Sequence, residues 1–458
     1  LYRYHMADQS REVVLNWLNM SMAGSNLELL ASFPDGRIMA LNRQYDREGG
    51  EQQMELAVLT RVPASETAQK TAVTFGTLKV DYYISEQILA FNRSNEACQI
   101  QVKEYGDDET GRMQLRADLL SGKGPDILDL DAVSSEAAIA RGLLTDLYPL
   151  MEQCPDTDKA DFLPSVLSIY ERDGRLYGIV PGFMIDSLMG KVSVVGEQTG
   201  WTVSDVQALC QSRPGAQLIR ATSREDVMRI MLSMGMEDFI DWRSGVCSFD
   251  SEEFISLLEF CSMLPSAEEA DYEDDFMERL ASGQLLLTEM HTYDVASYQL
   301  HAAFFAGEPV NCIGYPSSDG RGTLLEPGYS LAILEACPHK QEAWEFISWL
   351  LADEFQSSAW GYLPVRESSL QKVFDKAMET ETDYSYNSLS FELPAATPED
   401  IAAVRRMIDT GKGASMADGR LLQIVEEEAA AYFAGQKTAK DVAKIIQSRA
   451  QLYVDENR

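Results

Sequence analysis

Three aspartates in the stretch SGKGPDILDLD, residues 121–131, could hold a metal ion or act as general acids and bases. The glycines and the proline of this stretch are typical of the end of a helix and the start of a strand. Asp126 then stands at the start of the strand and Asp131 just past its carboxyl end, about 16 Å apart at ~3.3 Å per residue, with Asp129 near that end. One metal ion cannot bridge that distance. Asp131 instead falls where ligand loops follow the strands of a parallel sheet.

Other residues with catalytic or metal-binding potential form no recognisable motif. The four histidines, His5, His291, His301 and His339, lack zinc-ligand spacing, and no GxSxG, Walker or GxGxxG motif occurs. The seven cysteines include no CxxC pair and do not form a disulfide framework. Two distant carboxylates could still form the pair that glycoside hydrolysis requires. We therefore predict no catalytic residue, metal or cofactor, and keep a glycan-active enzyme as a less favoured alternative.

The chain is strongly acidic, with 73 acidic and 38 basic residues and a formal net charge of −35 over 458 residues. Nucleic-acid binding needs a basic surface, so no nucleic-acid partner is expected. The acidity favours a neutral or cationic ligand. No apolar run of ~18 residues indicates a membrane span. The start at Leu1 suggests a mature or trimmed product, whose export signal or lipid anchor would lie upstream.

The sequence changes character near residue 70. Residues 1–70 contain short strand-like runs with turn signals such as PDG at 34–36, which predicts an antiparallel β unit resembling one β-propeller blade. Beyond it strands alternate with helices, which predicts βαβ units and a mostly parallel sheet. FIDWRSGVCSFD (239–250) predicts a hairpin, residues 380–390 a mobile loop, and the last third is helical.

Local signals also mark the ends and faces of several helices. Ser223 with Asp226, and Thr438 with Asp441, have the spacing of helix N-terminal capping pairs. In KQEAWEFISWLL the apolar residues recur at helical spacing, so Trp344 is assigned to the core.

Aromatic and polar residues recur at the ends of the predicted strands. Aromatic faces stack on the C–H faces of sugars while polar neighbours bond the hydroxyls, so this mixture suits a neutral sugar. Packing in the core or a hinge is the competing explanation for each aromatic residue. The ligand-binding candidates from this pattern are Lys79, Asp81, Tyr82, Asp131, Thr222, Arg224, His291, Tyr293, Tyr329, Trp360 and Tyr362.

Five stretches, in this order, resemble the carbohydrate-type extracellular solute-binding proteins of ABC importers. They are GKGPDILDLDAVSSEAAIARGLLTDLYPLME, DGRLYGIVPGF, GYPSSDGRGTLLEPGYSLAI, KQEAWEFISWLLADEFQ and AAAYFAGQKTAKDVAKIIQSRAQ. The resemblance covers residues 71–458 and implies two lobes joined by hinge crossovers, which close over a ligand without catalysis.

The resemblance also implies positions for the ligand loops. They fall on Asp131 to Ser134, Thr222 to Arg224, and His291 to Tyr293, which adds Ser134 to the candidates. A maltose-binding member of the family has an aromatic residue in the place of Tyr293. It also has aromatics where this chain has Leu130 and Leu422, so the ligand class within sugars stays open.

The sequence thus predicts an α/β protein with a two-lobed, periplasmic-binding-protein-like (type II) fold after a small antiparallel β unit. Residues 1–70 form the accessory unit, 71–180 with 311–363 form lobe 1, and 181–310 with 364–458 form lobe 2. The predicted function is capture of a small solute, most favourably an oligosaccharide, and its delivery to an ABC permease. The protein is expected to be a monomer, lipid-anchored at the cell surface or periplasmic. A peptide, polyamine or other solute is the alternative ligand, and residues 1–70 could be an adhesion or docking module.

Overall fold

The computed structural model describes residues 1–45, 52–63, 70–154, 156–219, 223–268, 275–317, 319–357, 361–386, 389–413 and 418–457. The chain divides into two compact units. Unit 1 comprises Leu1–Ala132 and Ile333–Leu350, and unit 2 comprises Val133–Ala332 and Leu351–Arg458. The chain therefore passes between the units three times, after Ala132, Ala332 and Leu350. The three-part division drawn from the sequence stays a prediction.

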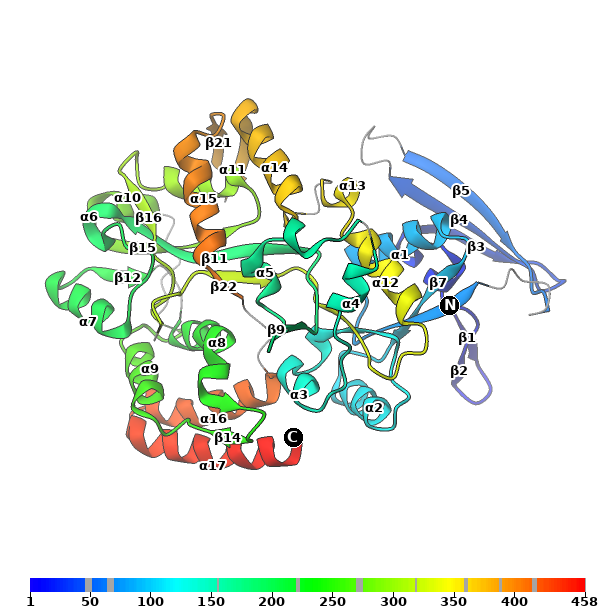
Figure 1. Ribbon diagram of the computed structural model, residues 1–458, viewed down its shortest axis with the longest axis horizontal. Helices are drawn as coiled ribbons and strands as arrows, with labels where there is room; N and C mark the ends of the chain where they lie inside the picture. Colours follow the sequence, from blue (N-terminus) through cyan, green and yellow to red (C-terminus); the bar gives the residue numbers. More distant parts are fainter. Residues whose placement is uncertain are drawn as a thin grey trace. The chain divides into compact units, whose positions relative to one another are not determined.

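Unit 1 begins with two small antiparallel sheets (blue in Figure 1). The sheets are the hairpin of β1 (Tyr2–His5) and β2 (Ser10–Val13), and the meander of β3 (Leu27–Ser32), β4 (Ile38–Tyr45) and β5 (Gln52–Leu59). The predicted PDG turn joins β3 to β4. Gly36 takes a φ of 86°, which favours glycine, and donates its N–H to the carbonyl of Phe33 at 3.0 Å. The antiparallel β unit predicted for this segment is confirmed for these strands.

The second part of unit 1 is a four-stranded sheet with helices. The strands run in the order β18 (Leu331–Ile333), β8 (Ile127–Asp129), β6 (Thr71–Thr77) and β7 (Cys98–Glu104), and of β18 only Ile333 belongs to unit 1. The helices are α1 (Tyr82–Ser94), α2 (Glu109–Leu120) and α12 (Lys340–Leu350). β6 pairs in parallel with both β7 and β8, as the βαβ prediction requires. α1 packs against α12, where the rings of Phe91 and Phe346 meet edge to face with centroids 5.1 Å apart. Trp344 is buried in this core, as predicted.

Unit 2 is built around one long strand. Its sheet contains β11 (Gly182–Lys191), β12 (Gln217–Ile219), β15 (Leu285–Thr292), β16 (Val310–Cys312), β17 (Leu324–Pro327), β19 (Leu363–Pro364) and β22 (Lys412–Gly413). β11 is antiparallel to β15, β16, β17 and β19, whereas β12 with β15 and β17 with β22 are parallel. The prediction of a mostly parallel sheet is therefore wrong for unit 2. Alternating strands and helices do not reveal that four later segments return beside β11 in the opposite direction.

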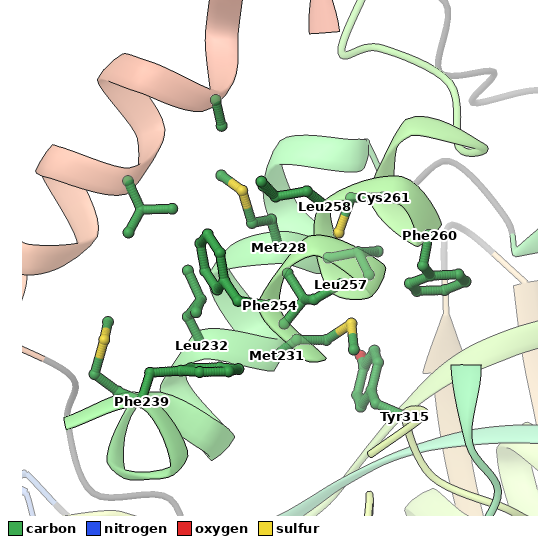
Figure 2. Close-up of a cluster of buried hydrophobic side chains, with 14 of the residues drawn as sticks. Met228, Met231, Leu232, Phe239, Phe254, Leu257, Leu258, Phe260, Cys261 and Tyr315 are labelled. Atoms are coloured by element: carbon green, nitrogen blue, oxygen red, sulfur yellow. The ribbon is translucent and has the colours of Figure 1, made fainter. Parts of the chain in front are cut away.

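Among the described residues, unit 2 contains fourteen α-helices. They are α3 (Ser135–Ala140), α4 (Tyr148–Glu152), α5 (Pro164–Leu167), α6 (Val192–Val195), α7 (Val203–Ser212), α8 (Arg224–Gly235), α9 (Glu252–Ser262), α10 (Phe276–Ser282), α11 (Val295–Ala303), α13 (Asp353–Gln356), α14 (Glu367–Glu379), α15 (Pro398–Thr410), α16 (Gly419–Phe433) and α17 (Ala439–Asn457). Figure 2 shows the apolar cluster between α8 and α9, in which Met228, Leu232, Phe254 and Leu258 are almost wholly buried. Each such side chain contributes about 1.5–3 kcal/mol on burial, so this cluster fixes the helices of unit 2.

Three hairpins extend from unit 2. They are β9 (Glu171–Arg172) with β10 (Arg175–Leu176), β13 (Ile240–Asp241) with β14 (Val246–Cys247), and β20 (Thr382–Tyr386) with β21 (Leu389–Leu393). The hairpin predicted for residues 239–250 is confirmed by β13 and β14. The mobile loop predicted at 380–390 is wrong, because TDYSY and LSFEL alternate as paired strands do. Residues 387–388, between those strands, lie outside the described residues.

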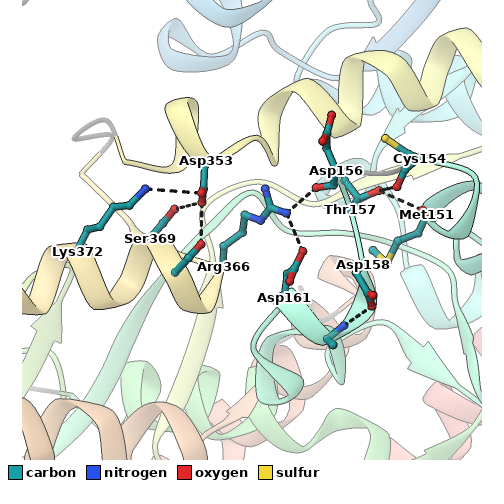
Figure 3. Close-up of polar contacts among 12 residues, drawn as sticks. Met151, Cys154, Asp156, Thr157, Asp158, Asp161, Asp353, Arg366, Ser369 and Lys372 are labelled. Atoms are coloured by element: carbon teal, nitrogen blue, oxygen red, sulfur yellow. Dashed lines mark hydrogen bonds and ion pairs between the residues drawn. The ribbon is translucent and has the colours of Figure 1, made fainter.

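A buried arginine joins distant segments of unit 2 (Figure 3). The side chain of Arg366 donates to the backbone carbonyl of Asp156 at 2.5 Å and to Oδ2 of Asp161 at 3.0 Å. Beside it, Oδ1 of Asp353 accepts a hydrogen bond from Ser369 at 2.9 Å. The two contacts of Arg366 anchor the start of α14 on the segment that follows α4, and the bond between Asp353 and Ser369 joins α13 to α14.

Candidate functional site

One face of the unit 2 sheet carries acidic residues around a histidine. Asp186 of β11 lies opposite His291 of β15. Glu289 of β15 lies opposite Leu188, two positions after Asp186 on β11. Glu326 of β17 lies opposite Met184, two positions before Asp186. Paired and alternate positions share a face of a sheet, so these side chains emerge together. With Tyr315, whose hydroxyl donates to Glu289 at 3.2 Å, they form what we call the acid–histidine cluster.

The cluster favours a protonated histidine. Nδ1 of His291 and the Asp186 carboxylate form a hydrogen-bonded ion pair. This hydrogen bond raises the pKa of His291 against the opposing effect of burial, and the charges of Asp186, Glu289 and Glu326 raise it further. The Asp186 side chain is only 13% exposed while that of His291 is 60% exposed, so the imidazole is open to a ligand.

Tyr315 is the buried hydrogen-bond donor of the cluster. Burial raises its pKa well above the ordinary value, and the charges of Glu289 and Asp186 raise it further, so the hydroxyl stays protonated. Three acidic side chains, Asp186, Glu289 and Glu326, thus surround one imidazole. Such a group accepts hydrogen bonds from ligand hydroxyl or ammonium groups, which are strongest when one partner is charged.

Two pairs of tyrosines lie at the ends of the same strands. Tyr293 follows β15, and its hydroxyl contacts the hydroxyl of Tyr384 on β20. Tyr329 follows β17, and its ring meets that of Tyr362 edge to face at 6.2 Å. A Cβ atom on Gly328 would approach the Tyr362 ring to 2.7 Å, so a glycine is required for this packing. The structure therefore brings the predicted residues Tyr329 and Tyr362 together.

The four candidates in unit 1 gather at the carboxyl ends of two parallel strands. Lys79, Asp81 and Tyr82 follow β6, and Asp131 follows β8. Asp81 caps α1 by accepting the N–H of Tyr83 at 2.6 Å, and Tyr82 is 46% exposed. These groups lie where the sequence predicts ligand loops. The capping contact gives Asp81 a structural role in α1.

The aspartates of the opening stretch have separate roles. Asp126 accepts hydrogen bonds from the backbone N–H of Thr74 at 2.8 Å and from its hydroxyl at 2.7 Å, which fixes the start of β8 beside β6. Asp129 accepts from Thr77 at 2.7 Å, and burial raises its pKa. Among the described residues, no group of three or more His, Cys, Asp and Glu side chains is arranged to hold a metal ion.

Two of the remaining candidates lie at the starts of helices. Ser134 is the N-cap of α3 and accepts the N–H of Ala137 at 3.3 Å. Arg224 starts α8, with its guanidinium 5.6 Å from the centre of the Phe433 ring. Thr222 and Trp360 lie outside the described residues.

Sequence reasoning missed Asp186, Glu289, Glu326, Tyr315 and Tyr384. A faint signal existed for Asp186, because GFMIDSLMGK contains one carboxylate in an otherwise apolar strand. Glu289 in QLLLTEM is a similar case. No local pattern marks Tyr384 as a partner of Tyr293, because the two residues are 91 positions apart.

The fold and this polar site define a class: a ligand-binding α/β protein with the two-lobed fold of periplasmic binding proteins. The chain belongs to the bacterial extracellular solute-binding proteins, whose family model matches residues 86–384. The predicted resemblance is thereby confirmed. Among curated proteins none matches this chain. No described helix is long and apolar enough to cross a membrane.

Several solved structures share the fold at low sequence identity. The sugar-binding protein MalE from Xanthomonas citri is 15% identical, with a TM-score of 0.55 over 84% of this chain and 98% of that one. The substrate-binding protein Lmo0181 from Listeria monocytogenes, in complex with cycloalternan, is 15% identical, with a TM-score of 0.52 over 84% of this chain and 100% of its own. An extracellular solute-binding protein from Alicyclobacillus acidocaldarius is 14% identical, with a TM-score of 0.51 over 85% and 100%. These similarities establish the fold.

Proposed function

We propose that this protein captures an oligosaccharide outside the cell and delivers it to the permease of an ABC importer, without catalysis. The observation that carries the proposal is the acid–histidine cluster, which lies beside two pairs of tyrosines in a solute-binding fold. Carboxylates bind sugar hydroxyls, and aromatic rings cover the C–H faces of sugar rings. Two proteins of similar structure support the same ligand class: the sugar-binding protein MalE from Xanthomonas citri, and the substrate-binding protein Lmo0181 from Listeria monocytogenes, which is in complex with cycloalternan.

Each group has a proposed role. Asp186 and Glu289 accept hydrogen bonds from sugar hydroxyls, and His291 donates one. Tyr293 and Tyr362 stack on sugar rings. Lys79, Asp81, Tyr82, Asp131, Ser134, Thr222, Arg224, Tyr329 and Trp360 complete the proposed ligand set. We also propose that the protein acts as a monomer, either lipid-anchored at the cell surface or periplasmic.

A thermal-stability screen tests the ligand class. A ligand that binds only the folded state stabilises it by RT ln(1 + [L]/Kd), about 4 kcal/mol at a thousandfold excess over Kd. We expect one family of oligosaccharides to raise Tm, Tyr293→Ala to abolish the shift, and Tyr4→Ala, on the exposed hairpin strand β1, to retain it. Chromatography of the glycan after incubation provides the second readout. Cleavage products would overturn the non-catalytic assignment, and silence from every sugar would overturn the ligand class.

A cationic solute is the second candidate, because the acid–histidine cluster holds three carboxylates and the whole chain has a net charge of −35. Spermidine and a basic peptide belong in the same screen. A cationic ligand would bind more weakly as ionic strength rises, because salt screens exposed charges over about 10 Å at 0.1 M. A neutral sugar would be insensitive to salt. Measuring the ligand's Kd at increasing sodium chloride concentrations therefore distinguishes a cationic ligand from a neutral sugar.

A further inference from the structure

Unit 2 contains a cavity of about 590 Å³ that shares no lining residue with the acid–histidine cluster. Its walls come from the start of α7, the end of α8, the first half of α9, and the residues Pro316, Ser317 and Arg321. Small-molecule sites in proteins have volumes of about 300–1,000 Å³. The cavity therefore has the size of a ligand site, and nothing in the proposed function uses it.

The floor of the cavity is apolar. Met231 of α8, Leu257 of α9 and Phe239 line it, and all three belong to the buried cluster drawn in Figure 2. Phe239 is held rigid by its contacts with Phe249 and Phe254, whose ring centroids lie 5.7 and 5.2 Å away. A fixed aromatic and aliphatic floor offers a surface for the apolar face of a ligand.

The rim of the cavity is rich in hydroxyl groups. The hydroxyl-bearing lining residues are Thr202, Ser204, Ser248, Ser251, Ser256 and Ser317. Thr202 and Ser251 cap helices, and Ser317 donates to Asp319. Among the described residues, the side chains of Ser204 and Ser256 make no hydrogen bond, and neither does that of Ser248. Each hydroxyl can donate one hydrogen bond and accept others, so three are available to a ligand.

The cations of the lining already have acidic neighbours. Lys412 lies 3.7 Å from Asp238, and Arg321 pairs with Asp319 at 3.0 Å. Glu253 is also in the lining and is exposed. The lining therefore carries two cations, Arg321 and Lys412, and two carboxylates, Asp238 and Glu253, a balance that favours neither an anionic nor a cationic ligand. A neutral ligand leaves the pairs in place.

We propose that this cavity is a second small-molecule site, which takes a neutral polyhydroxylated ligand with one apolar face: the chemistry of one or two sugar rings. The apolar face lies on Phe239 and Met231, and the ligand hydroxyls bond to Ser204, Ser248 and Ser256. This site binds its ligand independently of the acid–histidine cluster. The second-site proposal and the proposed function can therefore be refuted separately.

The probe is methyl β-D-glucopyranoside, followed by calorimetry and by the ¹³C-methyl signals of the methionines. We expect saturable binding that shifts the Met231 signal but not that of Met228, which is buried in the same helix outside the lining. Ser204→Phe should abolish both effects by filling the cavity. Ser212→Phe is the matched control, because Ser212 is an exposed serine of the same helix outside the cavity. Asp186→Asn should leave the shift of the Met231 signal intact, because Asp186 is not in the cavity lining.

A second set of variants tests the hydrogen bonds without changing the volume. Ser248→Ala and Ser256→Ala should each weaken binding about three- to tenfold, since a hydrogen bond contributes ~0.5–1.5 kcal/mol. Glucosamine and glucuronate serve as charged comparisons, and we expect neither to bind more tightly than the neutral probe. Binding that survives Ser204→Phe, preference for a charged probe, or a Met231 signal that does not respond would each overturn the proposal.

Discussion

The ion pair between Asp186 and His291 gives the structure a pH-dependent stability. The pKa of His291 is raised in the folded protein, first by the hydrogen bond to Asp186. A histidine whose pKa rises on folding contributes stability that is fully present below its unfolded pKa of about 6.5 and is lost as the pH rises through the folded value. Replacing Asp186 by Asn keeps the shape of the side chain and removes its charge, so this stability should disappear at low pH only.

The magnitude follows from the exposure of the pair. One pKa unit corresponds to about 1.36 kcal/mol, but the His291 side chain is 60% exposed and solvent screens it. We therefore expect Asp186→Asn to lower the free energy of unfolding by about 0.5–1 kcal/mol more at pH 5.5 than at pH 8.5. Urea unfolding at both pH values measures this difference. Equal losses at the two pH values would refute the reasoning.

A direct titration separates the pKa from stability. The sequence has four histidines, so the imidazole signals are few, and His291→Gln assigns the one in question. We expect the His291 pKa to lie above 6.5 in the wild type and to fall in Asp186→Asn, although Glu289 and Glu326 still hold it up. Glu12→Gln, which alters the neighbour of His5 in unit 1, should leave it unchanged. A wild-type pKa at or below 6.5 would contradict the structure.

Two further changes test the packing of unit 2. Arg366→Met should lower the free energy of unfolding, measured in urea, by about 1–3 kcal/mol, because it removes charge-assisted bonds from a buried site. The control is Arg243→Met, which should lower it by less than ~0.5 kcal/mol because the Arg243 side chain is 81% exposed. Gly328→Ala should lower the free energy of unfolding by about 1–3 kcal/mol and weaken ligand binding, because the added methyl group displaces the Tyr362 ring. The control is Gly419→Ala, which should leave the free energy of unfolding unchanged or raise it slightly, because the space around Gly419 is open. Equal effects within either pair would contradict the packing described.

Much of the fold could be predicted from the sequence because its signals are local. Ser223 accepts the N–H of Asp226 at 3.1 Å, and Thr438 accepts that of Asp441 at 3.2 Å, as their three-residue spacing predicts. The PDG turn and the hairpin at 239–250 are local in the same way, since the residues that form them are near neighbours. The family resemblance rests on similar short stretches.

The candidate site could be predicted only in part. The sequence singled out His291, Tyr293, Tyr329 and Tyr362, because a polar or aromatic residue near the end of a strand is visible in the chain itself. It gave no indication that the loop predicted at 380–390 is a hairpin that carries Tyr384. Residues 380–390 are mostly polar, which is also typical of a loop, and the pairing of TDYSY with LSFEL is not visible in either stretch alone.

By itself the sequence determined the helices and most strands, the family, and the residues that stand at strand ends. Only the tertiary structure decided which of these residues meet. Asp186 and His291 are 105 positions apart, and their contact depends on the antiparallel register of β11 and β15. A shift of one residue in that register would turn His291 to the opposite face, and register is set by packing across the whole sheet rather than by either strand alone.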